Sequence, residues 1–138
     1  GVACEQLVDR LAAGRVCSRD VCKTGGREEC GDNGKDVGLL RDGQLEAFGQ
    51  LLFDSHETSR TAFENSCDAL DVVVDAARDA GALGARLSGG GWGGSCIAMV
   101  QEADAEAVSR KIIARCREKG LEPTAEVIIP SAGAAVVS

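Results

Sequence analysis

The sequence contains few aromatic residues. Only 3 % of its 138 residues are aromatic, and tyrosine is absent. A hydrophobic core must therefore be built mainly from alanine, valine, leucine and isoleucine, within a chain whose residues are 44 % hydrophobic. With 27 % charged residues, this composition is ordinary for one soluble globular domain.

An excess of positive charge is also absent. The chain has 15 Lys and Arg against 22 Asp and Glu, which gives a net charge of −7. Proteins that bind nucleic acids carry clustered basic residues, so we expect no nucleic-acid partner. No apolar run approaches the roughly 20 residues that span a membrane, and the first residues, GVACEQLVDR, hold no signal-peptide core. We therefore expect a cytoplasmic protein with no membrane partner.

The seven cysteines fall into two groups. The first group is Cys4, Cys17, Cys22 and Cys30. These four have no C-x2-C spacing and no histidine nearby, so unpaired thiols are favoured over a zinc site, and their role stays open. The second group is Cys67, Cys96 and Cys116, which lie in apolar patterns typical of small buried residues. An odd number of cysteines without a secretion signal speaks against a disulfide framework, and we predict no metal site.

Hydrophobic residues recur at helical spacing in three segments of the second part of the chain. The pattern predicts a helix over residues 42–59. A second helix is expected to be capped by Ser66 and ended by Gly81, because these residue types are frequent at the two ends of helices. A third is expected to begin at Asp104 and to stop at Gly120.

The start of the chain has a different character. A short helix is expected over residues 3–13. Residues 14–38 are rich in glycine and charge and show no period, which predicts a loop or a disordered stretch. We therefore expect an irregular Cys- and Gly-rich segment over residues 1–38, followed by one domain over residues 39–138.

Three segments carry the signature of strands. Residues 83–88 alternate between small or apolar and polar side chains, and residues 96–100 form a continuous apolar run that predicts a buried strand pairing back as a hairpin. Residues 127–129 form a third apolar run before a proline. The order of elements predicts an α+β fold, with an antiparallel sheet and helices packed on one of its faces.

Five glycines and one tryptophan fill the six positions between the first two predicted strands. They are Gly89, Gly90, Gly91, Trp92, Gly93 and Gly94. A hairpin turn needs about two glycines, so a plain turn competes here with a loop whose bare N–H groups bind anionic oxygens. The loop is neither a Walker A loop, since no Gly-Lys-Ser/Thr follows, nor a dinucleotide fingerprint, since a strand follows where a helix would begin.

Three linked motifs resemble the C-terminal half of galactokinases. They are SHETS from Ser55, FENSCDALD from Phe63 and GARLSGGGWGG from Gly84, in the order and at about the spacing of that family. The tail PSAGAA from Pro130 is similar to the family's closing segment. The match covers roughly residues 40–138, and the glycine loop resembles the third motif of the wider GHMP class of small-molecule kinases. The resemblance implies the ferredoxin-like C-terminal domain of that class.

The resemblance also implies a reaction, which is transfer of the γ-phosphoryl group of ATP to the anomeric hydroxyl of galactose or a related sugar. In such kinases an N-terminal domain holds ATP, magnesium, the sugar and a catalytic aspartate, and none of its motifs is present here. We therefore expect no catalytic residue in this chain, no tightly bound cofactor and no activity without that domain. The alternatives are a non-catalytic ligand-sensing or regulatory protein and a free-standing binding domain.

The resemblance places several side chains near the cleft between the two domains. The glycine loop from Ser88 to Gly94 is expected near the reacting phosphates, and the residues expected to line the cleft are Ser55, His56 and Arg86. A structural or cleft-lining role is favoured for His56 over a general base, because no orienting partner or substrate site is evident. Arg86 could reach a phosphate, although arginines on strands are more often solvated or paired to acids. Trp92 stands where the family usually has Phe. Asp68 and Asp71 are expected near the first turn of a helix, where their negative charge interacts favourably with the helix dipole.

Overall fold

The computed structural model describes residues 38–128. The predicted helix over residues 3–13, residues 14–37 of the predicted loop, the first four cysteines and the tail from Pro130 lie outside the described residues. The chain divides into two units, one of which comprises Glu46–Val127. In the other unit the described residues form a helical turn at 38–41, and Gly43 follows with φ +70°.

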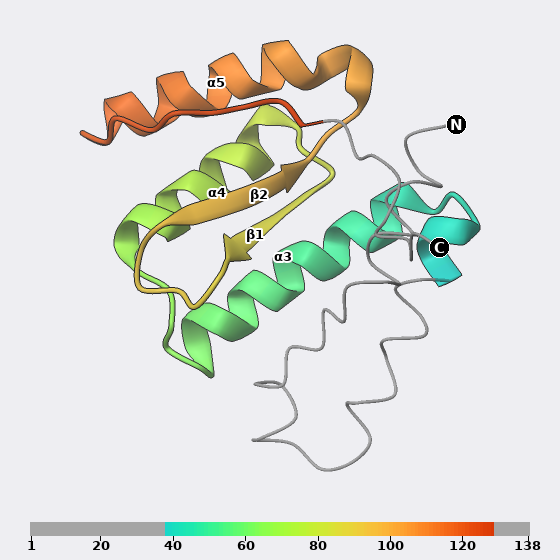
Figure 1. Ribbon diagram of the computed structural model, residues 1–138, viewed down its shortest axis with the longest axis horizontal. Helices are drawn as coiled ribbons and strands as arrows, with labels where there is room; N and C mark the ends of the chain where they lie inside the picture. Colours follow the sequence, from blue (N-terminus) through green and yellow to red (C-terminus); the bar gives the residue numbers. More distant parts are fainter. Residues whose placement is uncertain (1–37, 129–138) are drawn as a thin grey trace, which may run out of the picture. The chain divides into compact units, whose positions relative to one another are not determined.

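Helices and one antiparallel hairpin make up the unit from Glu46 to Val127 (Figure 1). In chain order the elements are α3 (Leu45–Thr61), α4 (Asp68–Ala80), β1 (Gly84–Ser88), β2 (Ser95–Met99), the short 3-10 helix η3 (Glu102–Asp104) and α5 (Ala105–Glu118). The two strands pair from Gly84 opposite Met99 to Ser88 opposite Ser95. The predicted α+β class, the three helices and the hairpin are confirmed.

The core lies where α4 packs against the hairpin. Helix α4 contacts both strands and also α5, and Figure 1 shows it between the strands and α5. Its buried face meets Phe53 of α3 and Ala85 of β1 through Val74 and Ala77. Aliphatic side chains and one phenylalanine thus fill this space, as the shortage of aromatic residues predicts. Their removal from water is the main favourable contribution to folding.

Helix α3 meets the start of β1 backbone against backbone. A Cβ atom at Gly49 of α3 would collide with the carbonyl group of Leu83, and a Cβ at Gly84 would collide with the backbone of Gly49. Both residues are buried. Glycine is therefore required at both positions by close approach, although neither residue has a positive φ.

The helices end close to the predicted positions, but the predicted capping contacts are not all formed. Gly81 adopts φ +94° and ends α4 as expected. The cap predicted for Ser66 is wrong, because Cys67 holds the N-cap position and the hydroxyl of Ser66 instead donates to Asp71. Asp104 holds the N-cap position of α5 but makes no side-chain capping hydrogen bond.

The second strand is more exposed than the sequence predicts. Residues 96–100 are expected to form a buried strand, yet Ile97 at the centre of β2 is 50 % exposed. The reason is that α4 covers one face of the hairpin and no other described strand pairs with β2. Residues 127 and 128 are not in a strand, contrary to expectation, and Ile129 lies outside the described residues. None of the helices in residues 38–128 is long and apolar enough to cross a membrane.

The contact between α3 and β1 yields a prediction about Gly49. In an ordinary helix, replacing glycine by alanine stabilises the protein by about 1 kcal/mol. For Gly49→Ala we expect the opposite, a loss of about 1–3 kcal/mol in the free energy of unfolding, because the added methyl group must displace the backbone of Leu83. Chemical denaturation measures the change.

The matched control is the reverse substitution at an exposed position of the same helix. Ala47→Gly should cost about 1 kcal/mol, which shows that α3 obeys ordinary helix propensity. A Gly49→Ala variant as stable as the unmodified chain, or more stable, would contradict the close approach.

Candidate functional site

The glycine loop is the connection between the two strands. The strand pairing ends at Ser88 opposite Ser95, so the six residues from Gly89 to Gly94 extend beyond the last pair. Four of the five glycines in the loop have positive φ: Gly89 at +86°, Gly91 at +90°, Gly93 at +137° and Gly94 at +93°. Residues with a side chain rarely adopt such angles, so these four positions require glycine for the path of the backbone itself.

The tip of the loop is fastened to the connection between α3 and α4. The backbone N–H of Trp92 donates to the carbonyl oxygen of Asn65 at 2.7 Å, and its indole Nε1–H donates to the carbonyl oxygen of Glu64 at 3.2 Å. The side-chain amide of Asn65 donates to the carbonyl oxygen of Gly90 at 3.4 Å. Trp92 and Glu64 both have positive φ, +56° and +52°, a conformation that costs residues other than glycine on the order of 1 kcal/mol. These hydrogen bonds stabilise that conformation.

Gly90 and Gly91 differ in what surrounds them. A Cβ atom at Gly91 would collide with the carbonyl group of Asn65, so this glycine is required by contact as well as by φ. At Gly90 the φ is not positive, and a Cβ atom would meet no atom within 4 Å. Nothing among the described residues therefore requires glycine at this position.

The buried side chain of His56 joins α3, β1 and α4 through hydrogen bonds. Its side chain on α3 is only 4 % exposed. Its Nδ1 accepts a hydrogen bond from the backbone N–H of Leu87 in β1 at 3.2 Å, and its Nε2 lies 3.1 Å from Oδ1 of Asp71 in α4. Because Leu87 N–H can only donate, Nδ1 carries no proton and Nε2 carries the proton that Asp71 accepts. Asp71 is thus an orienting partner that the sequence did not reveal, but both ring nitrogens are engaged within the fold, which gives His56 a structural role.

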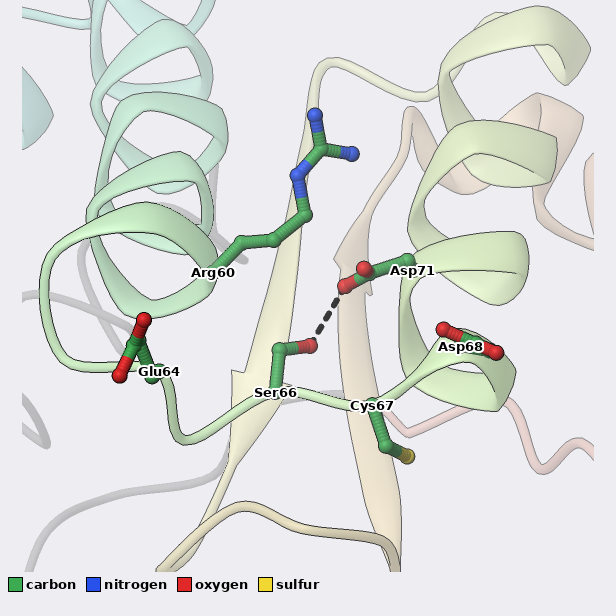
Figure 2. Close-up of a pocket in the computed structure, with 6 residues that line it drawn as sticks. All are labelled: Arg60, Glu64, Ser66, Cys67, Asp68 and Asp71. Carbon is green, nitrogen blue, oxygen red and sulfur yellow. Dashed lines mark hydrogen bonds between the residues drawn. The ribbon is translucent and has the colours of Figure 1, made fainter.

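Asp71 connects His56 to an open polar pocket at the start of α4 (Figure 2). Besides His56, its Oδ1 accepts a 2.5 Å hydrogen bond from the hydroxyl of Ser66, drawn as the dashed line. The pocket has a volume of about 290 Å³. It is lined by Arg60, Glu64, Ser66, Cys67, Asp68 and Asp71. Asp71 lies in the first turn of α4, as expected for a favourable interaction with the helix dipole. Its carboxylate also accepts two side-chain hydrogen bonds, which the sequence did not predict.

The other two residues expected at the cleft are chain neighbours of His56 and of its partner Leu87. Ser55 precedes His56 on α3 and is half-buried. Arg86 precedes Leu87 on β1, is half-buried, and donates from Nε to the carbonyl oxygen of Leu87 at 3.0 Å. Burial lowers the pKa of the Arg86 guanidinium, which keeps its charge because its ordinary pKa is so high. The structure records no ion pair between Arg86 and an acid in residues 38–128.

The described cysteines act as part of the packing. Cys67, Cys96 and Cys116 are free, and Cys116 is completely buried. Burial, followed by the nearby thiols of Cys67 and Cys116 and the carboxylate of Asp71, raises the pKa of the Cys96 thiol to about 11. Burial also raises the pKa of Cys116. Both thiols stay protonated near neutral pH and are poor nucleophiles. Residues 38–128 contain no cluster of three or more side chains suited to a metal ion.

Sequence reasoning missed the residues that hold the tip of the loop. Glu64 and Asn65 act mainly through backbone carbonyl groups, which leave no signature in the choice of side chain. For Asn65 the side-chain amide adds a contact to Gly90, while its buried Oδ1 has no hydrogen-bond partner among the described residues. The one available signal was the position of both residues within the motif FENSCDALD.

Comparison with known protein families gives a match over most of the described residues. The family described as GHMP kinases C terminal matches residues 37–118. The chain belongs to this family. Its hairpin, its glycine loop and the helices that hold the loop are therefore those of a GHMP kinase C-terminal domain.

Individual relatives narrow this assignment within the GHMP kinases. The chain is 43 % identical to a galactokinase of Streptomyces coelicolor over 99 residues, which cover 71 % of the chain and 26 % of the relative. It is 40 % identical to a galactokinase of Thermococcus kodakarensis over 100 residues, which cover 71 % of the chain and 28 % of the relative. The domain is galactokinase-like, and it spans about a quarter of the length of these relatives.

Solved structures support the same fold. The galactokinase of Lactococcus lactis in complex with galactose matches with a TM-score of 0.60 and 30 % identity, over 65 % of this chain and 24 % of that one. The L. major mevalonate kinase in complex with R-mevalonate matches with a TM-score of 0.56 and 32 % identity, over 62 % of this chain and 26 % of that one. Both are similar to this domain over only about a quarter of their own length.

The surroundings of the two central glycines of this GHMP domain predict different effects on stability. Gly91→Ala should lower the free energy of unfolding by about 1–3 kcal/mol, because it combines a disfavoured φ with a clash against Asn65. Gly90→Ala, the matched control, should change it by less than about 0.5 kcal/mol. Thermal denaturation of both variants checks this, and equal losses at the two positions would show that the loop does not rest on Asn65.

Proposed function

We propose that this domain is the C-terminal part of an ATP-dependent galactokinase, which transfers the γ-phosphoryl group to the anomeric hydroxyl of galactose or a closely related sugar in the cytoplasm. An N-terminal domain supplies the catalytic aspartate and the sites for the sugar and ATP with Mg²⁺, and this chain alone is inactive. The role of the chain is to close the cleft and to bring the loop from Ser88 to Gly94 against the transferring phosphate. The galactokinase relatives and the galactose complex of the similar kinase support this assignment.

One observation in the domain itself carries the proposal. Gly90 is exposed, has no positive φ, and has no neighbour that would meet a Cβ atom. Close approach by a group outside the described residues accounts for a glycine there, because the absence of a Cβ lets that group reach the backbone. A loop of bare backbone N–H groups suits phosphate oxygens, whose charge it can stabilise during transfer.

The surface around the loop fits contact with a further domain. Trp92 at the tip is 72 % exposed and Ile97 on β2 is 50 % exposed, so large apolar side chains face outward on the same hairpin. Exposed apolar area of this kind marks surfaces that bind another part of a protein. Arg86, half-buried on β1 and still charged, adds a cation near the base of the loop.

The proposal is tested by supplying the missing part. The matching C-terminal region of the Streptomyces coelicolor galactokinase is replaced by this chain, and the product is called the assembled kinase. We expect it to phosphorylate galactose with ATP. Gly90→Ala should lower its kcat on the order of a hundredfold with an unchanged melting temperature, because the methyl group displaces N–H donors from the developing charge.

The controls separate the alternatives. The 138-residue chain alone should show no transfer above background, and kcat in the assembled kinase should survive an exposed substitution remote from the loop, such as Lys111→Ala. An assembled kinase that folds and binds galactose but transfers no phosphate would favour a sensing or regulatory protein. Normal kcat in a folded Gly90→Ala variant would reduce the loop to a plain turn.

A further inference from the structure

We propose that His56 is the positioning residue of the glycine loop. Its neutral imidazole, protonated at Nε2, holds the backbone of β1 at Leu87 against Asp71 of α4 and so fixes the base of the loop. The hydrogen-bonded arrangement stands on the geometry alone. Its consequence for phosphoryl transfer rests on the function proposed above.

Both nitrogen atoms of His56 are engaged in hydrogen bonds within the fold. Nδ1 accepts from the backbone N–H of Leu87, and Nε2–H donates to Oδ1 of Asp71. The ring is buried, so neither atom is available to water or to a substrate hydroxyl. A general base needs a free lone pair within reach of the proton that it removes, and this histidine offers none. Its influence on the reaction must therefore pass through the groups that it holds.

The groups that His56 holds lie next to the base of the loop. Leu87 lies one residue before Ser88, where the strand pairing ends and the loop begins. Its N–H donates to the imidazole of His56 on α3, so the end of β1 before the loop is held against that helix. Asp71 is itself oriented by the hydroxyl of Ser66 at 2.5 Å, which limits the freedom of the carboxylate that orients the imidazole.

The connection between α3 and α4 also holds the tip of the loop. Asn65, the neighbour of Ser66, accepts from the backbone of Trp92 at the tip. Its own N–H donates to the carbonyl oxygen of Ser59 at 3.1 Å, which ties it to α3. Residues 64–71 therefore reach the tip of the loop directly and its base through His56. A loop held at its base and at its tip retains the preorganised geometry that charge stabilisation requires.

The experiment separates the two hydrogen bonds of the imidazole with a matched pair of variants. In His56→Asn the amide oxygen stands as many bonds from Cα as Nδ1 does, so the acceptor for Leu87 is retained. In His56→Gln the amide nitrogen stands as many bonds from Cα as Nε2 does, so the donor to Asp71 is retained and the acceptor is lost. Both variants remove the ring, and a role limited to filling the core would affect both alike.

Two measurements use the 138-residue chain itself. His56 is its only histidine, so selective 15N labelling gives one imidazole spectrum, which should show a protonated Nε2 and an unprotonated Nδ1. Hydrogen exchange at Leu87 and in the loop should be about tenfold faster in His56→Gln than in His56→Asn. This factor corresponds to the loss of one net hydrogen bond. A proton on Nδ1, or equal exchange in the two variants, would overturn the proposal.

The third measurement uses the assembled kinase. His56→Gln should lose about tenfold more kcat than His56→Asn, while KM for galactose differs little between the two variants. Equal kcat values in an active enzyme would refute the positioning role. An inactive assembled kinase would count against the proposed function alone, because the imidazole spectrum and the exchange rates test the attachment independently. If both variants fail to fold, the spectrum of the unmodified chain still decides the state of the imidazole on which the proposal depends.

Discussion

The carbonyl oxygen of Asn65 accepts a hydrogen bond from the backbone N–H of Trp92, and this contact sets the path of the glycine loop. The two backbones approach so closely that Gly91 has no room for a Cβ atom. The contact also brings Glu64 within reach of the indole N–H. The shape of the loop thus depends on the connection between α3 and α4 as much as on the residues of the hairpin.

Close backbone contact recurs at the start of the hairpin. Gly49 and Gly84 allow α3 to lie directly against β1, which brings His56 within hydrogen-bonding distance of Leu87. A larger residue at either glycine would move the helix away from the strand and lengthen that hydrogen bond. Packing at one end of β1 and hydrogen bonding at the other are therefore parts of one arrangement, and both serve to present the loop from a rigid support.

Much of the fold was predictable because its signals are local. The helical spacing over residues 42–59 and the glycine at the end of α4 led to elements close to those in the structure. The burial of β2 was not predictable, because an apolar run does not reveal how many neighbours its strand has. The role of Asp71 was underestimated for a similar reason, since its partner His56 is 15 residues away and meets it only after α3 and α4 have packed. The resemblance to galactokinases identified the loop, whereas the reason for each glycine required coordinates.

In the proposed enzyme the loop faces the transferring phosphate with its backbone already in place. Hydrogen exchange at the amide of Gly90 in the assembled kinase, with and without galactose and a non-hydrolysable ATP analogue with Mg²⁺, tests this directly. We expect exchange at Gly90 to slow when both ligands are bound, while Leu87 is protected in both states. Unchanged exchange at Gly90 in the saturated enzyme would contradict the account, because it would show that nothing approaches the one loop glycine that the domain itself does not require.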